Sequence, residues 1–178
     1  FSRLYNPISG WSLMYPETTG YIIPTFITYG KKFKQEIVIH KAIEMADWLL
    51  SIQYDDGSFP GGLFKKGITE KSIFNSSQII IGLVNIYNET RDDKYLEASI
   101  KCASWIVRNQ SDKGIWIKYN YEKGFTPSYY TRVSWPLLMV WKLNGDQKLK
   151  DAAIKTLELI YNRKLKNGFI KYSGFMMN

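Results

Sequence analysis

One pattern occurs three times along the chain and constrains its fold more than any single residue does. The first copy runs from Trp48 to Phe59, the second from Trp105 to Trp116, and a weaker third from Leu159 to Ile170. The starts of these copies are 57 and 54 residues apart. A fixed period of this size indicates that one supersecondary unit is used repeatedly.

Each copy of the pattern ends an amphipathic helix. Apolar residues recur at helical spacing before each copy, which predicts a helix with one buried face. The predicted helices lie near residues 36–53, 93–110 and 147–163. Asp92 or Asp93, and Asp146, stand where the N-caps of the second and third helices belong. A glycine follows each helix, as helix C-termini prefer: Gly57, Gly114 and Gly168.

A second and more apolar helix precedes each amphipathic one. These apolar helices are predicted near residues 18–30, 74–90 and 128–143. Aligning them places a poor helix former at one level of all three: Pro24, Gly82 and Pro136. We expect this level to mark the start of each helix or a kink in it.

The repeating unit is therefore predicted to be a helical hairpin, with an apolar inner helix covered by an amphipathic one. The fold class is all-α, in a single domain over residues 1–178, with hairpins at about 18–53, 74–110 and 128–163. Gly10-Trp11 precedes the first inner helix much as Gly57 and Gly114 precede the next two. We expect the chain to begin inside the loop of a preceding hairpin and to stop where another inner helix should begin.

Composition limits the classes of partner. With 45% hydrophobic and 16% aromatic residues, the 178-residue chain can form one domain with a substantial core. The net charge of +8 favours an acidic partner such as an anionic polysaccharide, a nucleic acid or a membrane surface. A solvated lysine-rich surface is the simpler explanation, because the lysines are scattered and no nucleic-acid motif occurs. No nucleic-acid partner and no transmembrane segment are predicted, since no apolar run approaches the ~20 residues that a membrane helix needs.

Thiol and imidazole chemistry is scarce in this chain. Cys102 is the single cysteine and lies in an apolar helical stretch, where a buried and inert thiol is expected. The single histidine, His40, opens a covering helix and is expected at the surface. A zinc site made by protein ligands alone is not expected, and no cofactor is predicted. Localisation stays open, with the cytoplasm slightly favoured.

The element from Gln53 to Phe59, Gln-x-x-Asp-Gly-x-aromatic, and its relative from Gln110 to Trp116 resemble the repeat motif of (α/α) toroid proteins. These proteins include terpenoid cyclases, protein prenyltransferases and six-hairpin glycosidases. The stretch from Trp11 to Pro24 looks like toroid proteins encoded in exopolysaccharide biosynthesis clusters. The resemblance implies a toroid or a partial arc of one. The missing hairpins would come from a longer chain or from another protomer.

The chain departs from two branches of that group. It lacks the Asp-x-Asp-Asp motif of protonating triterpene cyclases, since Asp55-Asp56 follows a helix instead. It also lacks an Asp/Cys/His set like the zinc site of prenyltransferases. A repeat motif of this kind indicates architecture better than activity, because one fold hosts many functions.

The resemblance implies a cavity at the N-terminal ends of the inner helices, and the repeat alignment identifies the residues there. They are residues 17–20 in the first hairpin, 75–78 in the second and 129–132 in the third. Helix capping explains the serines and threonines of this set. It does not explain Glu17, Gln78, Tyr130 and Arg132.

We predict Glu17, Tyr130 and Arg132 as catalytic residues. Glu17 would act as a general acid or base, Tyr130 as an acid, a base or a hydrogen-bond donor, and Arg132 would bind a uronate. A structural ion pair between Glu17 and Arg132 is the alternative. The predicted substrate-binding residues are Trp11, Tyr15, Asn75, Gln78, Tyr129 and Trp135. Asp55 and Asp56 are candidates for a second carboxylate, although a structural turn is favoured because Asp55 and Asp112 occupy the same repeat position.

The leading function is a carbohydrate-active protein of polysaccharide metabolism that acts on or binds an acidic glycan, with an enzyme favoured. Hydrolysis, elimination and epimerisation all stay open. A non-catalytic glycan-binding or scaffold module and an isoprenoid-binding, cyclase-like protein are the alternatives. A second carboxylate within ~5–10 Å of Glu17 would favour a glycosidase. A Tyr–Arg–Glu cluster would favour a lyase or an epimerase, and a dry aromatic cavity an isoprenoid.

Overall fold

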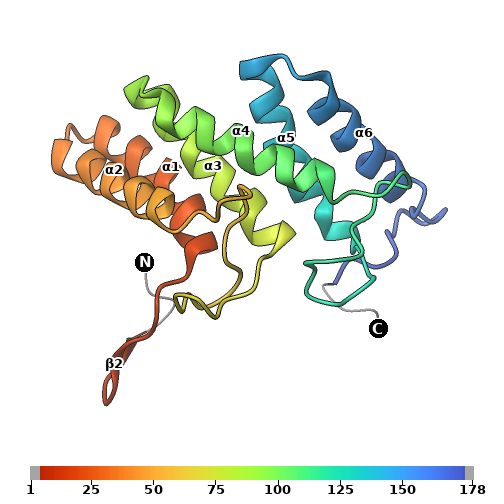
Figure 1. The fold of residues 1–178 in the computed structure, drawn as a ribbon, viewed down its shortest axis with the longest axis horizontal. Helices are drawn as coiled ribbons and strands as arrows, with labels where there is room; N and C mark the ends of the chain where they lie inside the picture. The colour runs from red at the N-terminus through yellow and green to blue at the C-terminus, as the bar shows by residue number, and fades with distance from the viewer. Residues whose placement is uncertain (1–4, 175–178) are drawn as a thin grey trace.

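The computed structural model describes residues 5–174, and helices dominate them (Figure 1). In chain order the elements are β1 (Tyr5–Asn6), β2 (Gly10–Trp11), α1 (Pro16–Lys32), α2 (Glu36–Ser51), α3 (Ile73–Thr90), α4 (Asp93–Arg108), the 3₁₀ turn η1 (Ser128–Tyr130), α5 (Thr131–Asn144) and α6 (Gln147–Tyr161). The two strands pair as a small antiparallel hairpin. The prediction of an all-α fold is confirmed.

The helices form three successive hairpins, α1–α2, α3–α4 and α5–α6, which lie side by side (Figure 1). The predicted helix ends differ from the observed ones by at most three residues. Asp92 and Asp146 cap α4 and α6, since their carboxylates accept the backbone N–H of Lys94 at 3.2 Å and of Lys148 at 3.0 Å. None of the helices between residues 5 and 174 is long and apolar enough to cross a membrane.

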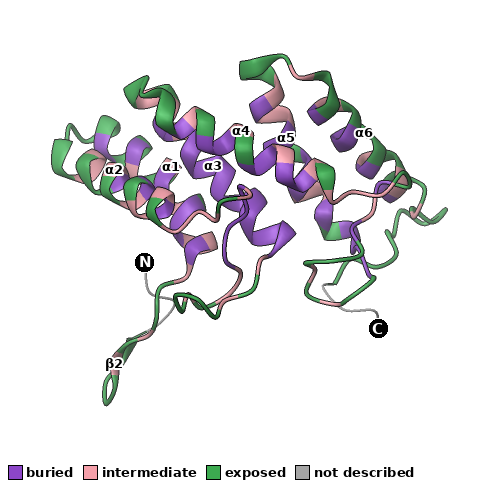
Figure 2. Ribbon diagram, viewed as in Figure 1, coloured by how far each residue is buried: buried purple, intermediate pink, exposed green. Residues whose placement is uncertain are grey.

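The middle inner helix, α3, lies at the centre of the core. It packs against α1 on one side and α5 on the other, and α4 covers it. Every residue from 73 to 84 is buried, which appears as the purple stretch of α3 in Figure 2. A helix surrounded in this way has little solvent face, which explains why its middle, residues 79–84, contains no polar side chain.

The three helix breakers lie inside α1, α3 and α5, so the prediction that they could mark helix starts is wrong. Gly82 has a packing reason. A Cβ atom at Gly82 would clash with the carbonyl oxygen of Gly20 in α1, and one at Gly20 would lie 2.6 Å from Cα of Ile79. The two glycines therefore allow the backbones of α1 and α3 to approach closely.

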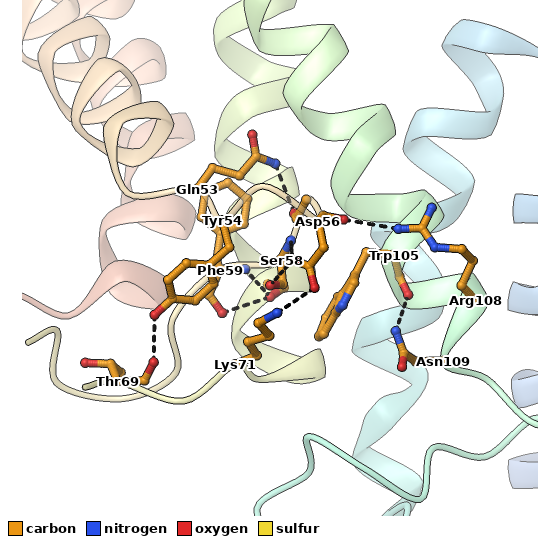
Figure 3. Close-up of polar contacts among 12 residues, drawn as sticks. Gln53, Tyr54, Asp56, Ser58, Phe59, Thr69, Lys71, Trp105, Arg108 and Asn109 are labelled. Atoms are coloured by element: carbon orange, nitrogen blue, oxygen red, sulfur yellow. Dashed lines mark hydrogen bonds and ion pairs between the residues drawn. The ribbon is translucent and has the colours of Figure 1, made fainter. Parts of the chain in front are cut away.

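The turn after each covering helix attaches one hairpin to the next. The side-chain Nε2 of Gln53 donates to the carbonyl oxygens of Gly57 and of Ala98 in α4, both at 3.0 Å. The Nε2 of Gln110 donates likewise to the carbonyl oxygen of Ala152 in α6 at 3.0 Å. Figure 3 shows the first of these turns, with Gln53 and Asp56 beside α4. The repeated motif thus has a structural role.

Glycine is required in the first two turns for two reasons. Gly57 and Gly114 have positive φ angles of +96° and +74°. A Cβ atom at Gly57 would also collide with the carbonyl oxygen of Lys101, and one at Gly114 would lie 2.8 Å from that of Lys155. Gly168 has a φ of +86°, but its missing Cβ has no neighbouring atom within 4 Å in the part of the chain that the structure describes.

Candidate functional site

The predicted polar residues lie at the first turns of α1, α3 and α5, and Asn75 links several of them. Asn75 is fully buried. Its Nδ2 donates to Oε2 of Glu17 at 2.8 Å, and its Oδ1 accepts from the hydroxyls of Ser72 at 2.7 Å and Tyr121 at 3.0 Å. Asn75 therefore holds a carboxylate from α1 and a phenol from the loop before η1 on one side chain.

Glu17 is partly buried in this cluster. Its burial raises the pKa of the carboxyl group, while the charge of Arg132 and hydrogen bonds with Tyr121 and Tyr15 act in the opposite direction. The net shift is upward because desolvation of the carboxylate is the largest contribution. When ionised, a carboxyl group with a raised pKa is a stronger base than an ordinary carboxylate.

Arg132 is oriented by Gln78. Its Nε and one terminal nitrogen donate to Oε1 of Gln78 at 3.1 and 2.9 Å. Gln78, which is fully buried, returns a bond from Nε2 to the carbonyl oxygen of Arg132 at 3.1 Å. The guanidinium also lies 5.9 Å from the ring centroid of Tyr129. The amide of Gln78 is thus the direct partner of Arg132, whose charge acts on Glu17 across the cluster.

Tyr121 belongs to this cluster but is not among the residues predicted from the sequence. Its ring is 51% exposed, but its hydroxyl reaches Asn75 and Glu17. Burial of the hydroxyl and the negative charge of Glu17 raise the pKa of Tyr121 well above its ordinary value. The phenol therefore stays protonated and offers a hydrogen-bond donor. The tyrosines of the loop at 119 and 121 were an available signal, but no repeat position pointed to them.

Tyr130, predicted as catalytic, lies in the aromatic core instead. It is fully buried, and its hydroxyl donates to Oδ1 of Asn120 at 3.1 Å. Its ring centroid lies 5.8 Å from those of both Phe74 and Trp116. Burial raises the pKa of Tyr130 well above its ordinary value. In this structure Tyr121, and not Tyr130, brings a hydroxyl to Glu17.

The predicted stacking residues differ in their positions. Tyr15 is half-buried beside Glu17. Tyr129 packs against Phe74, with ring centroids 5.4 Å apart. Trp135 on α5 is 51% exposed. Trp11 is 72% exposed on the projecting β1–β2 hairpin, where its ring centroid lies 4.9 Å from that of Tyr5.

Thr19 and Ser77, two of the hydroxyl residues predicted at the starts of the inner helices, do not cap these helices. The hydroxyl of Thr19 donates back to the carbonyl oxygen of Tyr15 at 3.0 Å, and that of Ser77 to Phe74 at 2.7 Å. Ser72, one turn earlier, is the N-cap of α3. The capping explanation is wrong for Thr19 and Ser77 because both already lie inside their helices, where the hydroxyl bonds a carbonyl oxygen of the preceding turn.

Asp56 stabilises the turn after α2, where both of its carboxylate oxygens have partners (Figure 3). Its Oδ2 lies 2.6 Å from Nζ of Lys71, and its Oδ1 accepts from the backbone N–H and the hydroxyl of Ser58 at 3.1 and 2.6 Å. Desolvation acts to raise the pKa of Asp56, but the hydrogen bonds from Lys71 and Ser58 outweigh it and lower the pKa to about 2. Asp55 is exposed. This geometry fits the structural turn considered from the sequence.

The remaining ionisable candidates lie outside the cluster. His40 is exposed on α2. Cys102 is fully buried in α4, where burial raises the pKa of its thiol. Within residues 5–174, no group of three or more His, Cys, Asp and Glu side chains is placed to hold a metal ion.

Comparison with known proteins gives information about the fold of this chain and none about its activity. No protein-family model matches the chain, and no curated protein matches it. Among solved structures, the chain is similar to the crystal structure of the Lin0763 protein from Listeria innocua, with a TM-score of 0.69 and 12% sequence identity. The similarity covers 88% of this chain and 46% of that one. This chain thus spans less than half the length of the matched structure, and the likeness concerns the fold alone.

Proposed function

We propose that this chain forms part of an (α/α) toroid and acts on an acidic glycan, by elimination or epimerisation beside a uronate carboxylate. The observation that carries the proposal is the convergence of Glu17, Tyr121 and Arg132 at the first turns of the inner helices, through Asn75 and Gln78 of α3. These groups are a base, a hydrogen-bond donor and a fixed cation.

The toroid is supported by the way in which the hairpins are joined. Each of the first two turns bonds to the covering helix of the following hairpin, through Gln53 and Gln110. Units that contact only their neighbours build arcs and rings when a constant rotation is repeated.

Recognition of the uronate is assigned to Arg132. A guanidinium binds a carboxylate through two parallel hydrogen bonds, which adds geometric specificity as well as energy. Gln78 holds this guanidinium through two nitrogen–oxygen contacts, so its orientation is set before a ligand arrives. The fixed positive charge would also stabilise the negative charge that spreads into the uronate carboxylate when the neighbouring carbon loses its proton.

The proton transfers are assigned from the two pKa shifts. Glu17, as a carboxylate, takes the proton from C5 of the uronate, and the electron pair moves into the carboxylate that Arg132 binds. Tyr121 keeps its proton and donates. In elimination the C4–O bond then breaks and Tyr121 protonates the leaving oxygen. In epimerisation the uronate separates the Tyr121 hydroxyl from Glu17, Tyr121 gives a proton to the opposite face of C5, and no bond to oxygen breaks. In both reactions the proton that Glu17 has taken then passes to the tyrosine oxygen, which restores both groups.

Hydrolysis is supported less well, because glycosidases of the usual kind need two carboxyl groups flanking the bond. The groups that act on Glu17 are Arg132, Tyr121 and Tyr15. The nearest sequence candidate for a second carboxylate, Asp56, is held by Lys71 and Ser58.

The test is turnover of uronate oligosaccharides, such as oligogalacturonate, oligomannuronate and oligoglucuronate. Elimination is followed by ultraviolet absorbance of the unsaturated product, and epimerisation by uptake of solvent deuterium at C5. We expect Glu17→Gln and Arg132→Ala to abolish turnover while the circular dichroism spectrum is kept. Glu44→Gln, at an exposed residue paired with Lys41, is the matched control and should keep full activity.

Three outcomes decide the proposal. Turnover lost in both site variants and kept in the control supports it. Binding of uronates that depends on Arg132, without turnover, would replace the enzyme by a glycan-binding module. Full activity in both site variants would show that the site assignment is wrong.

A further inference from the structure

A second cluster, formed by residues other than those around Asn75, lies where the loop after α2 meets the loop after α4. It is an open pocket of about 440 Å³, and its lining includes Tyr54, Thr69, Glu70, Lys71 and Tyr119. Tyr54 comes from the turn after α2, and residues 69–71 from the end of the following loop. Tyr119 comes from the loop after α4, two residues before Tyr121 of the candidate site.

Hydrogen bonds fix the wall formed by Tyr54. Its hydroxyl donates to the carbonyl oxygen of Thr69 at 2.6 Å, and its backbone N–H donates to that of Ser58 at 2.9 Å (Figure 3). Lys71 lies 5.6 Å from the ring centroid of Tyr54 and is paired with Asp56. The pocket therefore exists before any ligand binds, with little side-chain ordering left to oppose binding.

Tyr119 is held in a conformation that bulky residues avoid. Its φ is +63°, and its carbonyl oxygen accepts the N–H of Ile73, the first residue of α3, at 2.9 Å. The residue 57 positions earlier, one repeat back, is Gly62, with a φ of +72°. Glycine adopts this backbone without cost, whereas a residue with a Cβ pays roughly 1 kcal/mol or more. The backbone at position 119 therefore does not require a tyrosine.

The side chain of Tyr119 is placed to form a platform. Its ring centroid lies 5.3 Å from that of Trp105, which is buried, while Tyr119 itself stays 38% exposed. The ring is therefore supported from inside and accessible from outside. Together with Tyr54 it gives the pocket two aromatic surfaces from separate loops.

The polar groups limit the charge of the ligand. Lys71 offers donors, but its charge is compensated by Asp56 at 2.6 Å. Glu70 adds an exposed carboxylate that accepts hydrogen bonds. A pyranose ring meets these conditions, because its C–H face is apolar and its edge carries hydroxyls that both donate and accept. Among the lining residues that the structure describes, Lys71 is the positively charged one and is already paired with Asp56, so an anionic sugar would meet the negative charge of Glu70.

We propose that the pocket between Tyr54 and Tyr119 binds a neutral hexopyranose unit. The inference goes beyond the proposed function, since it requires neither Glu17 nor Arg132 and concerns a different class of sugar. If both sites are used, the glycan contains neutral as well as acidic units.

The experiment titrates the protein with cellotetraose, mannotetraose and maltotetraose separately, up to about 10 mM, which covers the weak affinities of single-sugar sites. Saturation-transfer NMR and tryptophan fluorescence report binding, since Trp105 supports Tyr119. We expect at least one neutral tetrasaccharide to bind. Tyr119→Asn should weaken this binding at least about tenfold, because asparagine tolerates the positive φ but removes the platform.

Tyr172→Asn is the matched control. Tyr172 has a φ of +61°, and its carbonyl oxygen accepts the N–H of Ser128 at the start of η1, at 2.7 Å. Its ring, however, lies against Phe125 and Arg163 and not in the pocket. Neutral-sugar binding lost in Tyr119→Asn but kept in Tyr172→Asn and Glu17→Gln supports the inference. No binding of any neutral tetrasaccharide, equal binding by Tyr119→Asn, or preference for a nucleoside probe would overturn it without touching the uronate test.

Discussion

The side-chain Nδ2 of Asn75 donates a hydrogen bond to Oε2 of Glu17 over 2.8 Å and so joins α3 to α1 at the candidate site. The two residues are 58 positions apart and correspond in the aligned repeats. An amide in one hairpin thereby binds the carboxylate that its neighbour carries at the same position. The site is thus built from a repeated position whose residue type differs between hairpins.

Glu17→Gln should increase stability at neutral pH while it removes activity. The pKa of Glu17 is raised from 4.5, so the folded protein binds this proton more tightly than the unfolded chain does. The stabilisation is complete below the unfolded pKa and is lost as pH rises through the folded pKa. Glutamine is uncharged at every pH, so the variant does not lose this stabilisation as pH rises. Its side-chain oxygen can still accept a hydrogen bond from Asn75.

Thermal unfolding at pH 4 and at pH 7 measures this effect. The melting temperature of the variant should exceed that of the wild type at pH 7, and the gap should narrow at pH 4. A variant that is less stable at both values would contradict the burial of an unfavourable charge at this position.

Tyr121→Phe should lower kcat by about 10²-fold, because it removes the proposed proton donor while keeping the aromatic ring. The lost hydrogen bond to Asn75 should cost only about 1 kcal/mol of unfolding free energy. Tyr161→Phe, at a tyrosine that is 71% exposed on α6, should change neither quantity. Steady-state kinetics together with urea unfolding separate the two effects, and an unchanged kcat would exclude Tyr121 from the chemistry.

Asp56→Asn should destabilise the first turn in a pH-dependent way. The pKa of Asp56 is lowered to about 2, so its contribution is present above the unfolded pKa of 3.8 and is lost as pH falls through about 2. Its side chain is 36% exposed, and solvent screening limits the expected cost to about 0.5–1 kcal/mol. Urea unfolding should show the full difference at pH 6 and a smaller one at pH 3. If the difference in unfolding free energy between the wild type and the variant is the same at both pH values, the charge of Asp56 does not stabilise the turn.

Alanine substitutions at the three turn glycines should have unequal effects. Gly57→Ala and Gly114→Ala combine a positive φ with a collision against the carbonyl oxygens of Lys101 and Lys155. We expect each to cost about 3 kcal/mol or more. Gly168→Ala meets open space and should cost only the roughly 1 kcal/mol of the left-handed conformation.

Chemical denaturation of the three variants measures the loss of unfolding free energy at the equivalent glycine of each turn. Equal losses for all three would show that the backbone conformation alone, and not packing between hairpins, requires glycine in these turns.

Much of the fold was predictable because it depends on local periodicity. Apolar spacing, the N-caps Asp92 and Asp146, and the turn glycines located the helices to within three residues. The repeat alignment also identified Glu17, Asn75, Gln78 and Arg132 as residues at equivalent helix starts, and the structure brings these four into one cluster. Their positions relative to one another follow from the positions of the helix starts, which the repeat alignment already predicts.

The sequence by itself determined the hairpin unit, its period and the level at which polar residues gather. Only the tertiary structure decided which side chains meet there. Tyr130 turns into the core and Tyr121 reaches Glu17 from a loop, because loop paths depend on long-range bonds such as Ile73 N–H to the carbonyl oxygen of Tyr119. The same holds for Gly82, a helix breaker in the sequence, whose reason is the close approach of α1 and α3.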